Sequence, residues 1–417
     1  MPAGQVNSAI RNYAFVTAAY WGQTLSDGAL RMLVLLHFHR IGYSPLQIAF
    51  LFLFYEFFGI VTNLVGGWIG ARLGLKVTLF SGLAIQIIAL GTLALLNPAW
   101  SVALSVVYVM ASQALSGIAK DLTKMSSKSA VKALVPADAT EGSLYKWVAI
   151  LTGSKNALKG VGFFLGGAML GWLGFAPSLW TMAGVLLATL LICAFALPHH
   201  IGQAKEKVGF GGVFSMTPAI NVLSAARFFL FGSRDVWFVV GLPVFLYDRL
   251  GWNFAQVGGF LALWVIGYGI VQASAPALTR GRGKKHSPAG SSAVLWTLLL
   301  AIIPALMALG FWRGLDASIV IIGGLAVFGF VFAINSAVHS FLILSYSDGD
   351  KVALNVGFYY MANAGGRLTG TVLSGWLFQV AGLPGCLWVS AGMALAAGLL
   401  SLRLPRRSGV SLQPQHA

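Results

Sequence analysis

Long apolar runs separated by short polar segments make up most of the chain. Each run has about 20 residues or more, the length that a helix needs to cross a hydrocarbon core of about 30 Å. We expect twelve membrane-spanning helices, at 13–36, 46–69, 77–96, 101–134, 147–173, 178–197, 219–246, 254–279, 290–310, 317–345, 352–378 and 383–403. The pattern therefore predicts an all-α membrane protein with twelve transmembrane helices.

Composition and charge agree with this prediction and add an orientation. With 58% hydrophobic and 9% charged residues and a mean hydropathy of +0.81, the chain does not fit the class of soluble globular proteins. If both termini are cytoplasmic, 18 of the 27 Lys and Arg residues fall in cytoplasmic segments, as the positive-inside rule requires. We expect a multi-pass membrane protein with both termini in the cytoplasm. The bilayer accounts for the basic residues, so no nucleic acid partner is predicted.

The two halves of the chain resemble each other. "HRIGYSPLQI" at 39–48 aligns with "DRLGWNFAQV" at 248–257, which brings Asp27 close to Asp235 in the alignment, and Lys159 falls opposite Arg367. Such internal repeats are common in transporters. We predict two six-helix pseudo-symmetric halves, 1–198 and 219–417, joined by a cytoplasmic linker at 199–218.

Ionisable residues inside the spans are costly and usually face a cavity or a partner. The cations are Arg31, Lys155, Lys159, Arg227, Arg234 and Arg367, and the acids are Asp27, Glu56 and Asp235. We expect Asp27 to pair with Arg31, and Asp235 to pair with Arg234 or Arg227. Three cations then lack an acid, which indicates an anionic substrate.

These residues give a first assignment of roles. The central substrate contacts are predicted to be Lys155, Lys159 and Arg367, with Arg31 and Arg234 next. Asn335 and His339 could hydrogen-bond the substrate, although a buried histidine satisfied by a neighbour explains His339 equally well. The proton-coupling candidates are Glu56 first, then Asp27 and Asp235. Glu56 could instead only position a neighbouring helix, and exchange for another anion would need no titrating acid.

Four lysines, at 120, 124, 128 and 132, recur every four residues at the end of the fourth span. On a helix they form one stripe. We expect Lys120, Lys124 and Lys128 to line the inner approach to the substrate site, since the rest of this segment carries few charges. The alternative is that the stripe binds anionic lipid head groups.

Catalytic and metal-binding patterns are missing from the sequence. It contains no His-Glu-x-x-His, Gly-x-Ser-x-Gly or phosphate-loop motif, so a membrane-embedded enzyme is disfavoured. Cys193 and Cys386 stand alone in their spans, whereas a soft metal or metalloid ion is usually held by clustered thiolates. We predict no catalytic residue, no cofactor and no metal, and we expect a monomer.

The segment "GGWIGARLGLK" at 66–76 resembles the cytoplasmic loop signature of the major facilitator superfamily. The matching residues are Gly67, Arg72, Gly74 and Lys76. Ala71 stands where the signature has an acid, which puts the usual charge pairing of this loop in doubt. The resemblance implies the major facilitator superfamily fold and a secondary active transporter that works by alternating access.

Longer runs, including "QALSGIAKDLTKMSSKSAVKALVPAD", "YKWVAILTGSKNALKGVGFFLGG" and "NSAVHSFLILSYSDGDKVALNVGFYYMANAGGRLTG", resemble the organoarsenical efflux permease family, ArsJ, of bacterial arsenic resistance. That resemblance implies export of 1-arseno-3-phosphoglycerate across the bacterial cytoplasmic (inner) membrane. This pentavalent ester forms when glyceraldehyde-3-phosphate dehydrogenase uses arsenate in place of phosphate, so the dehydrogenase is the implied functional partner. The alternative is a transporter of another organophosphate anion, by antiport or uptake.

Overall fold

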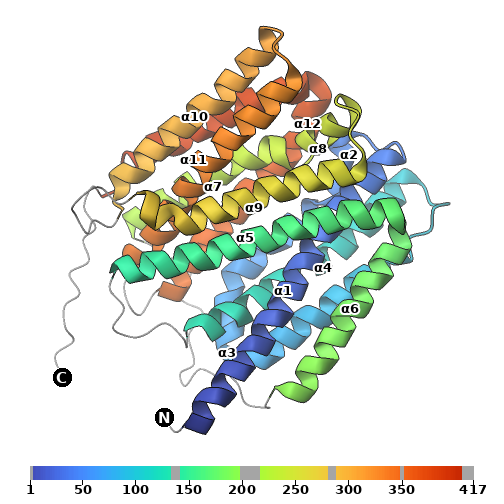
Figure 1. Cartoon of the computed structure of the whole chain (residues 1–417), viewed down its shortest axis with the longest axis vertical. Helices are drawn as coiled ribbons and strands as arrows, with labels where there is room; N and C mark the ends of the chain where they lie inside the picture. Colours follow the sequence, from blue (N-terminus) through green and yellow to red (C-terminus); the bar gives the residue numbers. More distant parts are fainter. Residues whose placement is uncertain (1–2, 133–140, 198–216, 280–287, 348–351, 406–417) are drawn as a thin grey trace.

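The computed structural model describes residues 3–132, 141–197, 217–279, 288–347 and 352–405, without the side chains of 3–13, 66–75, 125–132, 141–152 and 352–354. Within these ranges the chain forms helices and no strand (Figure 1). Their bounds are α1 Ala3–Arg40, α2 Pro45–Leu51, α3 Leu53–Ala94, α4 Val102–Lys132, α5 Glu141–Trp172, α6 Phe175–Ala196, α7 Pro218–Phe238, α8 Gly241–Asp248, α9 Phe254–Leu278, α10 Gly290–Trp312, α11 Ala317–Ser345 and α12 Val352–Ser401.

Helix α3 contains two spans rather than one. Its 42 residues would extend about 63 Å if straight, about twice the hydrocarbon thickness. Between positions 55 and 62 its neighbours on α4 rise from 117 to 121, whereas between 86 and 92 they fall from 116 to 112. The chain therefore reverses direction between residues 62 and 86, where the sequence predicts a turn. Gly67, Arg72 and Gly74 of the loop signature belong to α3, and the structure describes only the backbone at these positions.

Helix α12 also reverses. Between positions 366 and 374 its neighbours on α7 and α8 rise from 228 to 240, whereas between 390 and 393 they fall from 233 to 232. Gly382 lies between these stretches with a φ of 64°, a left-handed conformation that favours glycine. Helices α7 and α8 follow one another with a break at Val239 and Val240 and make a single span, so the predicted twelve-span, all-α architecture is confirmed.

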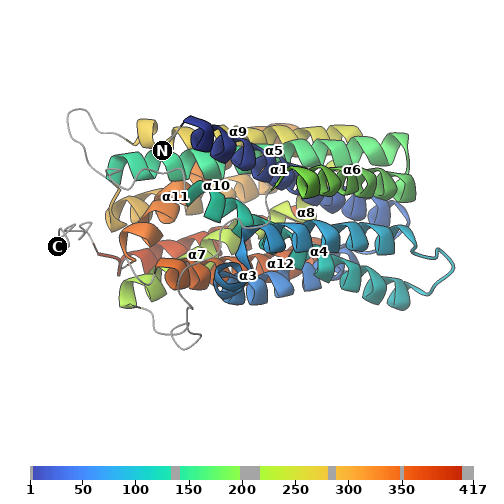
Figure 2. The ribbon, with the colours of Figure 1, turned by 90° about the horizontal axis from the view of Figure 1, so that it is seen from below.

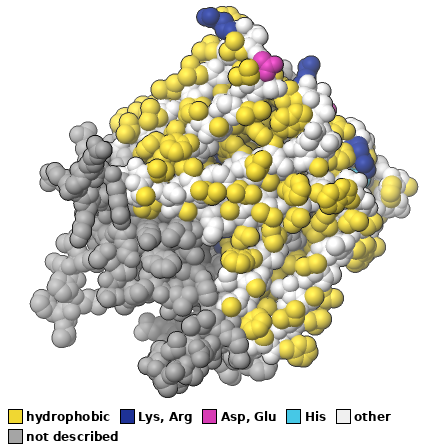
Figure 3. All heavy atoms as spheres, in the orientation of Figure 1, with side chains coloured by type: hydrophobic (Ala, Val, Ile, Leu, Met, Phe, Trp, Pro, Cys, Tyr) yellow, Lys and Arg dark blue, Asp and Glu magenta, His cyan; other side chains and the backbone are white. Residues whose placement is uncertain are grey.

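The outer surface of the bundle suits a bilayer. On the face in Figure 3, hydrophobic side chains cover the described surface, and the charged ones gather at its upper right edge. Large apolar side chains such as Phe195, Trp172 and Trp312 are 78–90% exposed, which water would not tolerate over so wide an area. Nine segments of the described chain are long and apolar enough to cross a membrane. α1 and α5 are not among these nine; both carry charges inside the bundle.

The two halves have matching local structure. Ser44 caps α2 and forms a capping box with Gln47, and Asn253 caps α9 and forms one with Gln256. Ser44 and Asn253 are 209 residues apart, and so are Gln47 and Gln256. This is the offset at which the two sequence runs align, so the same capping box occurs at the same position of each half. In Figures 1 and 2, α5 of the first half lies beside α9 of the second. Asn156 of α5 donates to Gln272 of α9 over 2.7 Å across this contact.

Lys76 is the one residue of the loop signature whose side chain is described. Its Nζ donates to the carbonyl of Leu197 over 2.7 Å, at the C-terminal end of α6. A cation at a helix C-terminus satisfies the last carbonyls and interacts favourably with the helix dipole. The loop signature thus connects the start of the third span to the end of the sixth.

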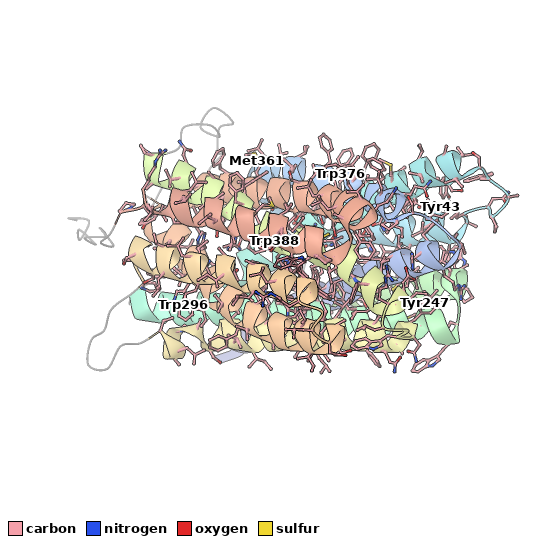
Figure 4. The ribbon with its side chains drawn as sticks, turned by 90° about the horizontal axis from the view of Figure 1, so that it is seen from above. Tyr43, Tyr247, Trp296, Met361, Trp376 and Trp388 are labelled. Atoms are coloured by element: carbon pink, nitrogen blue, oxygen red, sulfur yellow. The ribbon has the colours of Figure 1, made fainter. Side chains whose placement is uncertain are left out.

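At the end predicted to face outside, a histidine and an aspartate join the halves. His39 Nε2 lies 2.9 Å from Asp248 Oδ1, and these residues occupy the same position in the two repeats, 209 residues apart. Tyr247 stacks on Phe254 beside this pair. Figure 4 shows Tyr43, from the turn after α1, at the same end of the bundle as Tyr247. The pair is placed to hold this end closed.

We predict that His39→Ala opens this end more often. A partly exposed ion pair is worth about 1 kcal/mol or less, so the open fraction should rise up to about fivefold. The measurement is the rate at which a membrane-impermeant maleimide labels Leu46→Cys, at the contact between α2 and Gly375 of α12. The exchange His39→Asp with Asp248→His should restore the slow rate, and Arg313→Gln should not change it. Equal rates in His39→Ala and the parent would contradict the prediction.

Candidate functional site

Seven charged side chains from five helices meet inside the bundle. They are Asp27 and Arg31 of α1, Glu56 of α3, Lys159 of α5, Arg234 and Asp235 of α7, and Arg367 of α12. We call this set the central network. All seven were assigned from the sequence as substrate or coupling residues, and the structure brings them together. Their pairing, however, differs from the predicted one.

Glu56 is the centre of this network. Its Oε1 accepts hydrogen bonds from Arg31 Nη2 at 2.5 Å and from Arg367 Nη2 at 2.6 Å. Arg31 and Glu56 belong to the first half and Arg367 to the second, so one carboxylate oxygen links the halves. The side chain of Glu56 is 1% exposed. Both partners of Glu56 come from other helices, so its neighbours in the sequence do not reveal them.

Asp27 does not pair with Arg31 as the sequence suggested. Its Oδ2 lies 3.3 Å from Lys159 Nζ, and its Oδ1 accepts from the hydroxyl of Tyr55. α1 and α5 approach closely here, since a Cβ at Gly28 would lie 2.6 Å from the carbonyl oxygen of Lys159. Because Gly28 has no side chain, α1 and α5 can approach closely enough for Asp27 to pair with Lys159.

The second half repeats this arrangement. Asp235 Oδ2 lies 3.1 Å from Arg367 Nε, and a Cβ at Gly370 would lie 2.9 Å from the Cβ of Asp235. Asp27 with Lys159 and Asp235 with Arg367 are thus equivalent ion pairs, one in each half. The sequence alignment that set these residues opposite each other is confirmed by their common geometry.

Arg234 pairs with Asp235 as one of the two predicted alternatives. Its Nη2 lies 2.5 Å from Asp235 Oδ1. Its guanidinium also lies over the rings of Phe231 and Phe332, 4.9 and 5.4 Å from their centroids, contacts that attract a cation to an aromatic face. Arg227, the other alternative, lies elsewhere and belongs to a second cluster described below.

The lysine stripe points into the bundle where its side chains are described. Lys120 Nζ lies 4.0 Å from the ring centroid of Tyr55, next to the central network. Lys124 Nζ donates to Asn63 Oδ1 over 2.7 Å and lies 4.5 Å from the ring centroid of Tyr360 in the other half. Neither contact is available to a side chain that faces lipid. Lys128 and Lys132 are in α4, but their side chains lie outside the described residues.

Asp121 is a buried acid that the sequence analysis did not count among the intramembrane charges. It is fully buried, accepts from Thr62 over 2.8 Å and from Asn63 over 3.2 Å, and lies 3.5 Å from Lys124 Nζ. Its spacing of three residues from Lys124 was a usable signal, because such pairs meet on one helix face.

Lys155 lies on α5 one turn before Lys159 and is partly buried. Asn335 and His339 of α11 are not part of the central network. Asn335 donates to Thr297 of α10 over 2.7 Å, and His339 is fully buried. His339 lies about one turn after Ser336, the hydrogen-bond partner of Arg227, so these two predicted substrate contacts belong to the second half and lie apart from the central network.

Positive charge exceeds negative charge inside the described part of the bundle. The cations there are Arg31, Lys120, Lys124, Lys155, Lys159, Arg227, Arg234 and Arg367, and the acids are Asp27, Glu56, Asp121 and Asp235. Eight against four leaves a surplus of four. Lys120 and Arg227 form no ion pair with any carboxylate of the described residues. Burying an uncompensated charge is unfavourable, so an interior with this surplus favours the binding of an anion.

No group of three or more His, Cys, Asp or Glu side chains that could hold a metal ion occurs in the described residues. Cys193 and Cys386 are both buried and unpaired, on α6 and α12. The chemistry that the described interior offers is therefore ion pairing and hydrogen bonding by Arg, Lys and hydroxyl groups, which suits an oxyanion.

Solved structures of several transporters share this fold. The human organic anion transporter MFSD10 (TETRAN) aligns with a TM-score of 0.65 at 16% identity, over 94% of this chain and 99% of that one. A bacterial homologue of the iron transporter ferroportin, in its outward-facing state, gives 0.65 at 17% identity, over 93% and 98%. The proton:xylose symporter XylE gives 0.69 at 14% identity, over 95% and 97%.

Sequence comparison identifies the family. No curated protein sequence matches the chain. The family model of the Major Facilitator Superfamily matches residues 13–347, which is most of the chain and includes parts of both halves. The loop resemblance seen in the sequence points to the same family. The protein belongs to the major facilitator superfamily.

Proposed function

We propose that this transporter exports 1-arseno-3-phosphoglycerate, an anionic pentavalent organoarsenical, from the cytoplasm and thereby confers arsenate resistance. The observation that carries the proposal is the surplus of four positive charges among the described side chains inside the bundle. The substrate has a phosphate at one end and an arsenate at the other. Arg binds such groups through two parallel hydrogen bonds and Lys binds them as a point charge. The resemblance of long sequence runs to organoarsenical efflux permeases selects this anion among others.

The central network suggests how substrate binding is linked to alternating access. An oxyanion that enters it competes with Glu56 for Arg31 and Arg367. Because Glu56 joins these two arginines across the halves, its displacement removes a contact that holds the halves together. Binding would thus loosen the closed arrangement, and release of the substrate would let Glu56 re-form it. We assign Lys155, Lys159 and Arg234 as the other central contacts of the substrate, and Lys120, Lys124 and Lys128 as its cytoplasmic approach.

We further propose proton coupling, with Glu56, Asp27 and Asp235 as the carriers. Each is a buried carboxylate held by a cation, so a proton on any of them frees its cation for the substrate. The proposed setting is the bacterial inner membrane with both termini in the cytoplasm, where glyceraldehyde-3-phosphate dehydrogenase makes the substrate. A transporter of another organophosphate anion is the second candidate, since the same cations would bind it.

The direct test is arsenic uptake by everted membrane vesicles. Vesicles that contain the protein are given arsenate, glyceraldehyde 3-phosphate, NAD and the dehydrogenase. We expect arsenic to accumulate inside only when all four are present, because arsenate itself is not the substrate. Vesicles without the protein are the control. Uptake of arsenate without the dehydrogenase, or no uptake in the complete mixture, would rule out this substrate.

Lys159→Met is expected to abolish this uptake because it removes a central cation. It also leaves the buried Asp27 carboxylate without its cation, at a cost of about 3–5 kcal/mol in stability. The double variant Asp27→Asn with Lys159→Met removes both charges and should restore stability. We predict that the double variant reaches normal membrane levels, measured by immunoblot, but still fails to transport. Recovery of transport in the double variant would mean that Lys159 has only a structural role.

Glu56→Gln tests the coupling residue. We expect the variant to keep some substrate movement and to lose its dependence on the pH gradient, since the amide cannot take up a proton. Uptake is measured in the same vesicles with an imposed pH gradient and with an imposed membrane potential. Asp316→Asn, which changes an exposed acid that caps α11, is the control. A pH-gradient dependence like that of the parent would exclude Glu56 as the carrier.

A further inference from the structure

A second set of buried polar groups lies in the C-terminal half. It consists of Arg227 of α7, Gln272 of α9, Asn335, Ser336 and His339 of α11, and Tyr359 of α12. We call it the Arg227 cluster. Every member is at most 3% exposed. Arg227 donates to the hydroxyl of Ser336 over 3.3 Å and to its carbonyl over 3.5 Å, and Gln272 donates to the same hydroxyl over 3.3 Å.

Much of the hydrogen-bonding capacity of this cluster is unused. The atoms without a partner among the described residues are Arg227 Nε, Asn335 Oδ1, both ring nitrogens of His339 and the Tyr359 hydroxyl. Arg227 also has no carboxylate within ion-pairing distance in the part of the chain that the structure describes. Its guanidinium rests on the rings of Phe231 and Tyr359, 3.9 and 5.0 Å from their centroids. Arginine does not lose its proton inside proteins, so this charge stays and needs an anion.

The equivalent helices of the first half show which group the Arg227 cluster lacks. Ser101 and Asp316 are the first-turn caps of α4 and α11, each accepting from the amide three residues on, so these helices are offset by 215 residues. Asp121 then corresponds to Ser336, and Lys124 to His339. Asn63 and Gln272, at the 209-residue offset of the earlier helices, make the equivalent hydrogen bonds to Asp121 and to Ser336.

The two clusters differ by one negative charge. In the first half, Asp121 provides the carboxylate and Lys124 neutralises it at 3.5 Å. In the second half, a neutral hydroxyl stands in the position of that carboxylate, and Arg227 provides a positive charge beside it. The second half therefore has the cation and the donors of an ion pair without the acid.

From this comparison we propose that the Arg227 cluster is an anion-binding subsite for one terminal oxyanion group of the transported substrate. The oxyanion takes the role that the Asp121 carboxylate has in the first half. Arg227 Nε, one His339 ring N–H and the Tyr359 hydroxyl donate to its oxygens, while Asn335 Oδ1 accepts from a substrate hydroxyl. The identity of the substrate rests on the proposed function, but the subsite requires only a phosphoryl or arsonyl group.

The position of the cluster also suits a two-ended anion. Gln272 accepts a hydrogen bond from Asn156 of α5 over 2.7 Å. On the same helix, Lys155 directly precedes Asn156 and Lys159 follows it by three residues. One helix thus borders both the central network and the Arg227 cluster. A molecule with an anionic group at each end can satisfy both sets of cations, whereas a molecule with one such group can satisfy only one.

The test uses the purified full-length protein and two stable probes, 2,3-bisphosphoglycerate with two anionic ends and glycerol 3-phosphate with one. Affinities are measured by isothermal titration calorimetry. Arg227→Gln should bind 2,3-bisphosphoglycerate about 10- to 100-fold more weakly, the loss expected for hydrogen bonds to a charged group. Arg249→Gln, which changes an exposed arginine at the opposite end of its span, should bind like the parent. Unchanged affinity in Arg227→Gln would overturn the proposal.

Ser336→Asp separates binding from structure. It introduces the acid that the first half has at Asp121, so the new carboxylate should neutralise Arg227. We expect a higher midpoint of thermal unfolding together with weaker binding of 2,3-bisphosphoglycerate. If Arg227 were only structural, stability would rise and affinity would stay the same, which would contradict the proposal. If Arg227→Gln does not fold, Ser336→Asp alone tests whether Arg227 binds the anion.

The two proposals fail in different ways. If 2,3-bisphosphoglycerate binds in an Arg227-dependent manner while the vesicles take up no arsenic, the subsite stands and the arsenical substrate falls. If the vesicles take up arsenic and Arg227→Gln transports and binds like the parent, the substrate stands and the subsite falls.

Discussion

The structure depends on one shared carboxylate. Glu56 accepts from Arg31 and Arg367 with the same oxygen, and those arginines belong to different halves of the bundle. Inside a low-dielectric interior, neither arginine can remain without a counter-charge, so Glu56 holds the halves together at the depth where the cations gather. An entering anion offers the same arginines a different partner. In the proposed mechanism, binding and the separation of the halves are therefore parts of one exchange of ion pairs.

Pseudo-symmetry organises the rest of the interior. The pairs Asp27–Lys159 and Asp235–Arg367 are equivalent, and His39 meets its own counterpart, Asp248, at one end of the bundle. Where the symmetry is broken, a charge is left over. Glu56 has no acidic counterpart in the second half, and Ser336 replaces Asp121 there. The two missing acids account for two of the four excess positive charges in the described interior, and this excess is the basis of the proposed anion transport.

Much of this was predictable from the sequence, for physical reasons. A membrane requires about 20 apolar residues per span, so the spans and the reversal near Lys76 follow from composition alone. The alignment of the two halves places Asp27 near Asp235, and Lys159 opposite Arg367, from the sequence alone. The partners of Glu56 were not predictable, because they come from α1 and α12 and depend on how the helices pack. The pairing of Asp121 with Lys124 was predictable from their spacing of three residues on one helix. The unpartnered atoms around Arg227 were not predictable, because they depend on the positions of all neighbouring atoms.

The central claim is that a substrate anion competes with Glu56 for Arg31 and Arg367. The most direct measurement is the affinity of the Glu56→Gln protein for 2,3-bisphosphoglycerate, determined by calorimetry beside the parent protein. Removing the internal competitor should strengthen binding, since Arg31 then loses its carboxylate partner and Arg367 keeps only Asp235. Equal or weaker binding in the variant would contradict the account.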